Sequence, residues 1–437
     1  MDAPEDLQTA ANASTVVPQL GQRPSTIARV GVIGGGQLAW MMAPAAKKLN
    51  LELVVQTPRA SDPAAAIASR TILAPLTDAG ATAKLSQYCD VITFENEFVD
   101  LAALQRLQTE QQVTFYPPLN ALTPLLDKAT QRAYCQSIGL PTPKFIALDQ
   151  SSLSQIGLEQ ISPEQISPEH SNLEQPMQSH KQVIEAAIAK LGLPIVLKTC
   201  RHGYDGQGTY ILPNAAAVEA TWQDLNFSPI LLEEFISFDR ELAIMVARSQ
   251  SGEVATYPIV ETQQVNQVCR RVNAPANITD GLVRTIETMA RSLMESLGAV
   301  GVFGIELFLT PDEQVLVNEI APRTHNSGHY SLDACLTSQF EQQLRAVSGL
   351  PLGETALTCR RAVMVNLLGY EDSTSDYLDK RRQLAKLPNS HLYWYGKTNA
   401  HPERKLGHVT VRLGVGNRAD PWTARDVITR VESLWYG

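Results

Sequence analysis

The chain has 437 residues, of which 44% are hydrophobic and 19% are charged, so its composition supports a large buried core. At roughly 150 residues per domain, this length predicts about three domains. The formal net charge of −9 argues against broad nucleic-acid binding but leaves room for a local basic pocket. The scattered cysteines form no CxxC pair and indicate reduced thiols in a cytoplasmic protein. We expect no membrane segment, because no apolar run approaches the roughly 20 residues that a membrane helix needs.

Composition and hydrophobic periodicity divide the chain into five segments. The first is rich in Ala, Gln, Pro, Ser and Thr and has no periodicity, which predicts a disordered tail. The second alternates apolar strands with helical patterns and predicts an open parallel α/β domain. Within the third, residues 149–182 contain Ile-Ser-Pro-Glu twice and have linker composition, which predicts an inserted surface loop. The expected segments are 1–27, 28–125, 126–240, 241–360 and 361–437.

A glycine triplet at 34–36 lies between the apolar strand at 28–33 and a helical pattern at 37–49. Its G-x-G-x-x-A spacing matches the dinucleotide fingerprint, in which glycine lets a phosphate approach the backbone. A nicotinamide cofactor also needs an acidic residue after the second strand, and that strand ends in Gln56 and Thr57. The turn therefore predicts either a phosphate or small polar ligand, or a tight turn that needs glycine for packing.

A second glycine-rich segment joins the predicted strands at 195–198 and 209–212. Lys198 ends the first of these strands, and the loop after it contains Gly-Tyr-Asp-Gly-Gln-Gly. A flexible glycine loop can fold over a triphosphate, and a lysine at its base can neutralise the phosphate charge. An ordinary hairpin with a solvated tip is the alternative, which Tyr204 and Asp205 make less favourable.

The apolar strand predicted at 231–236 contains two adjacent carboxylates, Glu233 and Glu234, and Glu241 follows it. Two carboxylates on one strand could contact a polar ligand. An edge strand with one polar face explains the same pattern, so these residues alone assign no function.

The pair of Glu306 and Glu319 is the sharpest signal in the sequence. These residues lie in two predicted strands, 303–309 and 315–320, that a short polar turn joins into a hairpin. In a symmetric hairpin the numbers of paired residues have a constant sum, and centring the turn pairs the two glutamates. Like charges directly opposite each other destabilise a sheet, and a magnesium ion between them would relieve the repulsion. A solvated pair is the alternative.

The same register makes further predictions about the hairpin. It places apolar pairs on one face, toward the core, and the glutamates on the other. Phe308 and Val317 are expected on the face of the glutamates, which indicates a partly covered cleft. The expected apolar pairs are Leu309 with Leu316 and Ile305 with Ile320.

A dense polar run, Ile-Ala-Pro-Arg-Thr-His-Asn-Ser-Gly-His, follows Glu319 directly. Arg323, His325 and Asn326 combine a cation, an imidazole and an amide within four residues. Such a loop can bind an anion and transfer a proton. A single histidine is more often structural, but this polar run beside a carboxylate pair favours a functional site.

A basic cluster follows the aromatic residues Tyr-Trp-Tyr near the C-terminus. It comprises Lys397, Arg404, Lys405 and His408. In an acidic protein this cluster is a candidate phosphate site. A solvated hairpin loop explains these residues equally well.

Together these motifs resemble the ATP-grasp superfamily and, within it, the N5-carboxyaminoimidazole ribonucleotide synthases. The resemblance extends from about residue 28 to at least 415, and the run at 318–329 together with Arg-Lys-Leu-Gly-His is specific to this family. It implies an ATP-grasp fold with an N-terminal open parallel α/β domain, central ATP-grasp domains and a small C-terminal domain. The matching stretches are 34–38, 203–208, 318–329, 338–341 and 404–408.

The resemblance also implies a role for each matching residue. Glu306 and Glu319 are expected to bind Mg²⁺, and Tyr204, Arg323 and His325 to take part in catalysis. The residues expected to contact ATP are Lys128, Lys198, Gly203, Asp205, Gly206, Gln207, Glu233, Glu234, Phe235, Ile236, Glu241, Asn318 and Glu319. Those expected to contact the ribonucleotide are Gly36, Gln37, Leu38, Glu95, Glu97, Tyr204, Asp205, Asn326, Lys397, Arg404 and Lys405.

The reaction implied by the resemblance has two stages and belongs to purine synthesis. Bicarbonate attacks the γ-phosphate of ATP to give carboxyphosphate, which then delivers CO₂ to the exocyclic amine of aminoimidazole ribonucleotide. The resemblance also implies a homodimer. One departure from the family pattern, Thr-Phe-Glu-Asn-Glu-Phe at 93–98, leaves open whether Glu95 or Glu97 contacts the ribonucleotide.

Three alternatives remain at this point. Another ATP-grasp ligase, such as a formate-dependent glycinamide ribonucleotide transformylase or a biotin carboxylase, would use a different acceptor. A nicotinamide dehydrogenase would use the glycine turn, although the missing acidic residue argues against it. A nucleotide-binding scaffold would bind ATP without releasing ADP.

Overall fold

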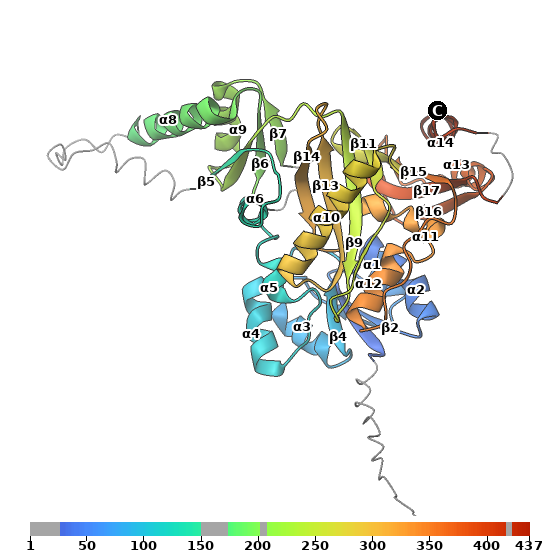
Figure 1. Cartoon of the computed structure of the whole chain (residues 1–437). Helices are drawn as coiled ribbons and strands as arrows, with labels where there is room; N and C mark the ends of the chain where they lie inside the picture. The colour runs from blue at the N-terminus through green and yellow to red at the C-terminus, as the bar shows by residue number, and fades with distance from the viewer. Residues whose placement is uncertain (1–26, 150–173, 202–207, 417–421) are drawn as a thin grey trace, which may run out of the picture.

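The computed structural model describes residues 27–149, 174–201, 208–416 and 422–437 (Figure 1). The expected N-terminal tail therefore lies outside the described residues, apart from Ile27, as does most of the expected insert at 149–182. Within the described part, no helix is both long and apolar enough to cross a membrane. All six cysteines are free, as the sequence predicts.

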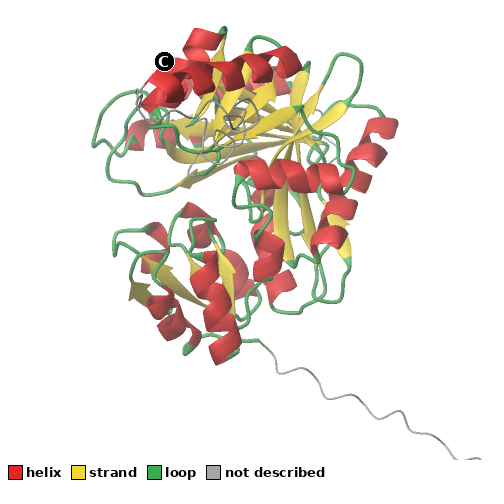
Figure 2. Ribbon diagram, turned by 90° about the vertical axis from the view of Figure 1, so that its left-hand side faces the viewer, coloured by secondary structure: helices red, strands yellow, loops and turns green. Residues whose placement is uncertain are grey.

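The N-terminal part is a parallel four-stranded sheet in the order β3-β2-β1-β4, and Figure 2 shows helices packed around it. Successive residues of the central strand, such as Val32 and Ile33, belong to different buried clusters, so both faces of the sheet are covered. This confirms the predicted α/β architecture. The strands are β1 (Arg29–Ile33), β2 (Glu52–Thr57), β3 (Arg70–Leu73) and β4 (Val91–Phe94). The helical elements are α1 (Gln37–Met41), α2 (Ala43–Lys48), η1 (Pro63–Ala66), α3 (Ala79–Ser86), α4 (Leu101–Gln111) and α5 (Leu119–Leu122).

The helix predicted at 37–49 is divided into α1 and α2. Pro44 lies in the first turn of α2 and has no backbone N–H to donate to the preceding turn. A proline is tolerated there because the first N–H groups of a helix have no partner within it. Met41 and Met42, on either side of the break, stay buried in the same cluster.

A smaller antiparallel sheet has the order β5-β8-β6-β7 and carries two helices, at the upper left of Figure 1. Because β8 lies between two other strands, the edge-strand interpretation of 231–236 is wrong. The hairpin predicted around the glycine loop is confirmed by the pairing of β6 with β7. The elements are β5 (Phe145–Leu148), α8 (Glu174–Leu191), β6 (Ile195–Thr199), β7 (Thr209–Leu212), α9 (Ala215–Asp224) and β8 (Ile230–Glu234).

The expected insert is shorter than the sequence indicates, because α8 already begins at Glu174. The end of the expected loop is therefore helical. His180 is buried there, with its ring 4.3 Å from that of Phe227 and 5.3 Å from that of Trp222. These contacts stabilise a turn of helix whose polar composition predicts a loop.

The largest sheet has the order β14-β13-β9-β11-β12-β15-β17-β16, and β10 pairs with β9. It continues from β12 to β15 across the predicted limit between 360 and 361, so the last two predicted segments share one sheet. Its strands are β9 (Arg240–Arg248), β10 (Val254–Thr256), β11 (Val260–Val265), β12 (Val268–Ala274), β13 (Gly301–Leu309), β14 (Val315–Ala321), β15 (Arg361–Leu368), β16 (Ser390–Trp394) and β17 (Lys405–Leu413).

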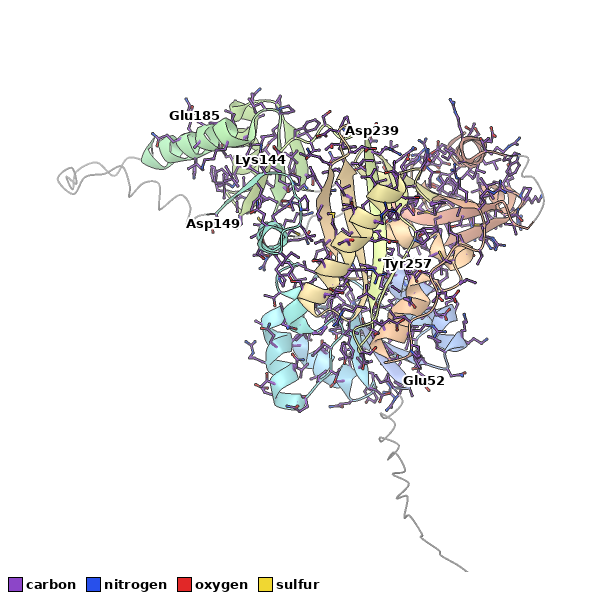
Figure 3. All side chains as sticks on the ribbon, viewed as in Figure 1. Glu52, Lys144, Asp149, Glu185, Asp239 and Tyr257 are labelled. Atoms are coloured by element: carbon purple, nitrogen blue, oxygen red, sulfur yellow. The ribbon has the colours of Figure 1, made fainter. Side chains whose placement is uncertain are left out.

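Helices attach this sheet to its neighbours. Tyr257, labelled in Figure 3, is buried and donates its hydroxyl to the carbonyl of Thr337 at 3.0 Å, just before α12. Phe340 and Leu344 of α12 pack in the same cluster as the N-terminal strands, which joins the two sheets. The helical elements are α6 (Lys128–Ser137), α10 (Asp280–Leu297), η3 (Asn326–Gly328), α11 (Ser331–Ala334), α12 (Gln339–Val347), α13 (Leu378–Leu384) and α14 (Ala424–Tyr436).

The amphipathic helix predicted at 279–297 is confirmed as α10. The Thr279 side chain accepts the N–H of Leu282 at its start, and Gly298 ends it with a φ of 57°. Ile286 and Leu293 belong to the core cluster that this helix shares with β9, β13 and β14.

Replacing the buried Leu293 of α10 tests this packing. Leu293→Ala should lower the free energy of unfolding by about 3 kcal/mol, because it leaves a cavity in a closed core. The matched control Leu73→Ala removes a side chain that is 59% exposed and should change it by less than about 0.5 kcal/mol. Urea denaturation followed by circular dichroism measures both, and equal shifts would contradict this placement of α10.

Candidate active site

The β13–β14 hairpin places Glu306 directly opposite Glu319, as the sequence predicts, and pairs Ile305 with Ile320. The predicted pair of Leu309 with Leu316 is wrong. The register shifts by one residue after Glu306, so Leu309 pairs with Val315 and Phe308 with Leu316. The shift also turns Val317 into the core and away from the glutamates, which corrects its predicted position.

The cause of the shift is a β-bulge at Asn318, which has no partner on β13. The bulge directs the polar groups of Asn318 toward two cations. Its side-chain oxygen accepts a hydrogen bond from Lys198 Nζ at 3.1 Å, and its carbonyl accepts one from Arg132. Because Lys198 belongs to β6 and Asn318 to β14, their hydrogen bond connects the small sheet to the large one.

The two opposed glutamates have different electrostatic environments. Burial, together with the nearby Glu319 and Glu241, raises the pKa of Glu306 to about 8. Burial also acts on Glu319, but the ammonium groups of Lys128 and Lys198 outweigh it and lower its pKa to about 2. Lys128 Nζ lies 3.1 Å from Glu319 Oε2. The pair therefore holds one firmly ionised carboxylate and one that gains from a further positive charge.

Lys198 and Glu233 form a buried ion pair next to this hairpin. Lys198 Nζ lies 2.7 Å from Glu233 Oε2, and Arg132 contacts the other oxygen of the same carboxylate. Burial would raise the pKa of Glu233, but the two cations lower it to about 2. Glu233, which is predicted to contact ATP, thus holds Lys198 in place.

The other residues predicted to contact ATP lie around the same junction. Burial raises the pKa of Glu241, on β9 beside Phe308 of β13, to about 7. The Glu234 side chain accepts the backbone N–H of Lys144 at 2.8 Å, and Phe235 is 41% exposed just beyond β8. Five predicted residues lie outside the described part of the chain: Gly203, Tyr204, Asp205, Gly206 and Gln207.

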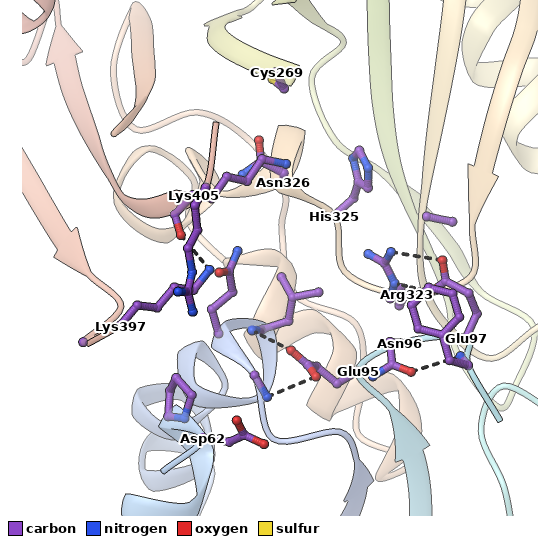
Figure 4. Close-up of a pocket in the computed structure, with 18 of the residues that line it drawn as sticks. Asp62, Glu95, Asn96, Glu97, Cys269, Arg323, His325, Asn326, Lys397 and Lys405 are labelled. Atoms are coloured by element: carbon purple, nitrogen blue, oxygen red, sulfur yellow. Dashed lines mark hydrogen bonds and ion pairs between the residues drawn. The ribbon is translucent and has the colours of Figure 1, made fainter. Parts of the chain in front are cut away.

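A cavity of about 570 Å³ connects the carboxylate pair with the N-terminal and C-terminal parts. Figure 4 shows its wall, with Arg323 and Glu97 on one side, Lys397 and Lys405 on the other, and His325 between them. The structure therefore brings together residues that are far apart in sequence. The predicted residues that line it are Gly36, Gln37, Leu38, Glu95, Glu97, Glu306, Glu319, Arg323, His325, Asn326, Lys397, Arg404 and Lys405.

Glu95 occupies the glycine turn of the N-terminal sheet. Its carboxylate accepts the backbone N–H groups of Gly36 at 3.1 Å and Leu38 at 3.2 Å. Burial raises its pKa despite these hydrogen bonds. A side chain at Gly34 or Gly36 would collide with this carboxylate, and Gly34 has a φ of +119°. The turn thus needs glycine for packing, and its N–H groups are used by the protein instead of a dinucleotide phosphate.

Glu97 has a different partner. Its two oxygens accept hydrogen bonds from Arg323 at 2.7 and 3.2 Å, a bidentate pair that crosses from the N-terminal part to the end of β14. Burial opposes ionisation of Glu97, but Arg323 lowers its pKa overall. Arg323 is thereby held at the cavity wall in one orientation.

One of the four residues predicted for the basic cluster, His408, does not belong to it. Lys397, Arg404 and Lys405 line the cavity, but His408 is buried within β17. Burial lowers the pKa of His408 to about 3, so it is neutral and contributes no positive charge. Burial and the nearby Arg59 lower the pKa of Arg404, which indicates two guanidinium groups close together.

Several cavity residues were not identified from the sequence. Arg59 and Asp62 follow the carboxyl end of β2, where ligands of parallel sheets bind, so strand order could have identified them. The turn between β11 and β12 gave no signal, because glutamine and asparagine are common in turns. The residues missed include Ser61, Gln264, Gln267, Thr398 and Asn399.

Three family models match consecutive parts of the chain. They are the ribonucleotide synthetase preATP-grasp domain at residues 27–124, the ATP-grasp domain at 173–340, and the phosphoribosylaminoimidazole carboxylase C-terminal domain at 362–418. The fold and the site together thus define an ATP-grasp enzyme with a preATP-grasp domain.

Full-length relatives give the family within this class. The N5-carboxyaminoimidazole ribonucleotide synthase of Synechococcus elongatus is 52% identical over 412 residues, which cover 94% of this chain and 96% of the relative. A crystal structure of an N5-carboxyaminoimidazole ribonucleotide synthetase with ADP has a TM-score of 0.77 and 33% identity, covering 94% and 98% of the two chains. The synthase of Aspergillus clavatus, crystallised with ADP and aminoimidazole ribonucleotide, has a TM-score of 0.76 and 27% identity, covering 93% and 96%.

The chain belongs to the N5-carboxyaminoimidazole ribonucleotide synthase family, an ATP-grasp ligase family. The family and the fold predicted from the motifs are confirmed. The nicotinamide dehydrogenase interpretation is wrong, and Glu95 already occupies the N–H groups that it needed. The individual roles of the site residues stay predictions.

The buried His408 predicts a pH dependence of stability. The unfolded chain binds a proton at this residue near pH 6.5, whereas the folded chain does so only near pH 3. Stability should therefore fall as the pH drops below about 6.5, by about 1.4 kcal/mol per pH unit for this histidine. His408→Asn should reduce that slope in urea titrations between pH 6.5 and 5. A slope equal to that of the control His401→Asn, which alters an exposed histidine, would contradict the burial of a neutral His408.

Proposed function

We propose that this chain carboxylates aminoimidazole ribonucleotide with bicarbonate and ATP, giving N5-carboxyaminoimidazole ribonucleotide, ADP and phosphate in purine synthesis. The observation that carries the proposal is a single cavity bounded by a carboxylate pair and by a basic cluster. The carboxylate pair suits the phosphoryl-transfer end of ATP, and the basic cluster suits a ribonucleotide phosphate. The names of the relatives support the same substrates.

The nucleotide end of the site lies where β6, α6 and β14 meet. Lys128 and Lys198 would neutralise the ATP phosphates, and the ion pair with Glu233 keeps Lys198 extended toward them. Glu241 would accept hydrogen bonds from the ribose. The glycine loop after Lys198 lies largely outside the described residues, and its role of covering the phosphates stays a prediction from the sequence.

Glu306 and Glu319 fit a magnesium ion. Both offer carboxylate oxygens, the ligands that Mg²⁺ prefers, and burial beside Glu319 and Glu241 raises the pKa of Glu306 to about 8, so a further positive charge would favour its ionised form. Mg²⁺ bound there would neutralise charge on the transferring phosphoryl group. Glu306 and Glu319 both line the cavity, so an ion held by them would lie at the wall of the space in which bicarbonate and the ribonucleotide would meet.

His325 places an imidazole beside the carboxylate pair. Its Nε2 lies 3.6 Å from Glu306 Oε1, while its Nδ1 contacts the hydroxyl of Ser327 at 2.8 Å and the backbone N–H of Ser327 at 3.4 Å. Because a backbone N–H can only donate, Nδ1 accepts, and the neutral ring has its proton on Nε2. We assign His325 to proton transfer at the bicarbonate, and Arg323 to anion binding beside it.

The ribonucleotide would lie across the cavity with its phosphate at the basic cluster. Lys397 and Arg404 come from the loop between β16 and β17, Lys405 begins β17, and Arg59 approaches from the N-terminal part. The Lys397 ammonium donates to the carbonyl of Lys405 at 2.6 Å, which fixes the shape of this loop. Gly36, Gln37 and Leu38 would contact the ribonucleotide from the opposite wall.

Assembly and location are part of the same proposal. The family resemblance supports a homodimer, and six free cysteines suit the reducing cytoplasm. Light scattering of the purified chain tests the assembly, and a mass of one chain would overturn the dimer.

ADP release in degassed buffer tests the proposed reaction. ADP should appear from ATP only when both aminoimidazole ribonucleotide and bicarbonate are present. ADP release at the same rate with and without the ribonucleotide would indicate an ATP-grasp ligase with a different acceptor. ATP binding without ADP release under any condition would identify a scaffold.

Replacing Glu319 tests the carboxylate pair. Glu319→Ala should lower kcat for ADP release at least ~100-fold, because the phosphoryl group loses its charge stabilisation. The control Glu313→Ala removes an exposed glutamate from the turn of the same hairpin and should leave kcat unchanged. Near-normal turnover of a folded Glu319→Ala would remove this residue from the site.

A further inference from the structure

The Asn326 side chain, which lines the cavity, is held by a second asparagine behind it. Asn366 of β15 is fully buried, and its Nδ2 donates to Asn326 Oδ1 at 2.7 Å. In return, Asn326 Nδ2 donates to Asn366 Oδ1 at 3.1 Å. The two amides thus form a reciprocal pair across the β15 strand and the η3 turn.

A third contact fixes the orientation of this pair. Asn366 Nδ2 also lies 2.8 Å from the backbone carbonyl oxygen of Cys269 on β12. A carbonyl oxygen can only accept, so the Asn366 atom facing it must be the nitrogen. With its nitrogen at the Cys269 carbonyl, the Asn366 amide has its oxygen at the other end. An oxygen there can accept a hydrogen bond only from the nitrogen of Asn326. The main chain of β12 therefore decides, through Asn366, which way the Asn326 amide points.

This orientation has a consequence for the cavity. Among the described residues, Asn366 is the one hydrogen-bonded to the Asn326 side chain, and it uses one of the two N–H groups of Asn326 Nδ2. The second N–H is left for a ligand, and it can bind only an acceptor atom. The preceding residue is fixed in a comparable way, because the buried Gln339 amide bonds both the N–H and the carbonyl of His325, at 2.9 and 2.7 Å.

We propose that Asn366 is a positioning residue that orients the Asn326 amide so that it donates an N–H to an acceptor atom of the bound aminoimidazole ribonucleotide. The inference rests on the proposed function, in which this ribonucleotide occupies the cavity. Without Asn366, the Asn326 amide can rotate and present its oxygen, which would repel the same acceptor atom. Asn366 itself does not line the cavity.

Steady-state kinetics of Asn366→Leu test this role. The variant keeps the number and branching of the side-chain heavy atoms but removes the amide, and it should raise the KM for the ribonucleotide about 10-fold, the effect of one lost hydrogen bond, with the KM for ATP changed less than about twofold. The control Thr410→Val alters a buried polar side chain of the neighbouring β17, whose hydroxyl has no partner among the described residues. It should leave both KM values unchanged.

A double-mutant cycle separates positioning from a general structural effect. If Asn366 acts through Asn326, then Asn366→Leu should add less than about twofold to the ribonucleotide KM in an Asn326→Ala background. The inference would be overturned if the ribonucleotide KM of the double variant rose by the product of the two single effects, or if Asn366→Leu left that KM unchanged. Either result would leave the proposed function standing. An unmodified chain without ribonucleotide-dependent ADP release would overturn both.

A crystal structure of the unmodified full chain with ADP and aminoimidazole ribonucleotide gives a test that needs no folded variant. An acceptor atom of the ribonucleotide should lie within about 3.2 Å of Asn326 Nδ2. A ribonucleotide donor facing Asn326 Oδ1, or no contact with Asn326, would contradict the inference.

Discussion

Two carboxylates face each other across the β13–β14 hairpin, and their repulsion is the constraint around which the site is arranged. At about 5 Å and an effective dielectric constant of about 20, two such charges repel by about 3 kcal/mol. Lys128 and Lys198 stabilise the ionised form of Glu319 and lower its pKa to about 2. At Glu306, burial and the neighbouring Glu319 and Glu241 outweigh the effect of Lys405 and Lys128, and its pKa rises to about 8. The remaining imbalance suits a ligand that brings positive charge.

The lysines at Glu319 depend on contacts between separate sheets. Lys198 comes from the small sheet and reaches the large one through Asn318, the residue that bulges from β14. The buried Glu233 holds the same lysine from the other side. Below this junction the N-terminal part closes the cavity with the Glu97–Arg323 pair. In the proposed function, a phosphoryl-transfer centre and a ribonucleotide site would thus share one cavity, and a reactive carboxylated intermediate would have only a short distance to travel.

The sequence was most informative where chemistry and local geometry coincide. The pairing of Glu306 with Glu319 follows from hairpin symmetry, and the family follows from the run that contains Arg323 and His325. The bulge was missed because nothing in the residues around Asn318 distinguishes a regular strand from a shifted one. His408 was assigned to the basic cluster because its burial depends on the distant elements that pack against β17. Arg59 and Asn366 were missed because their roles depend on contacts between segments far apart in sequence.

Isotope transfer tests the central claim, that bicarbonate meets the γ-phosphate of ATP in this cavity. The measurement is the ¹⁸O content of the phosphate that the chain releases from ATP, in the presence of aminoimidazole ribonucleotide and ¹⁸O-labelled bicarbonate. The proposed attack of a bicarbonate oxygen on the γ-phosphate predicts one ¹⁸O atom in each phosphate released. Phosphate without ¹⁸O, formed at the same rate as the carboxylated product, would contradict the account, because bicarbonate would then not be the nucleophile.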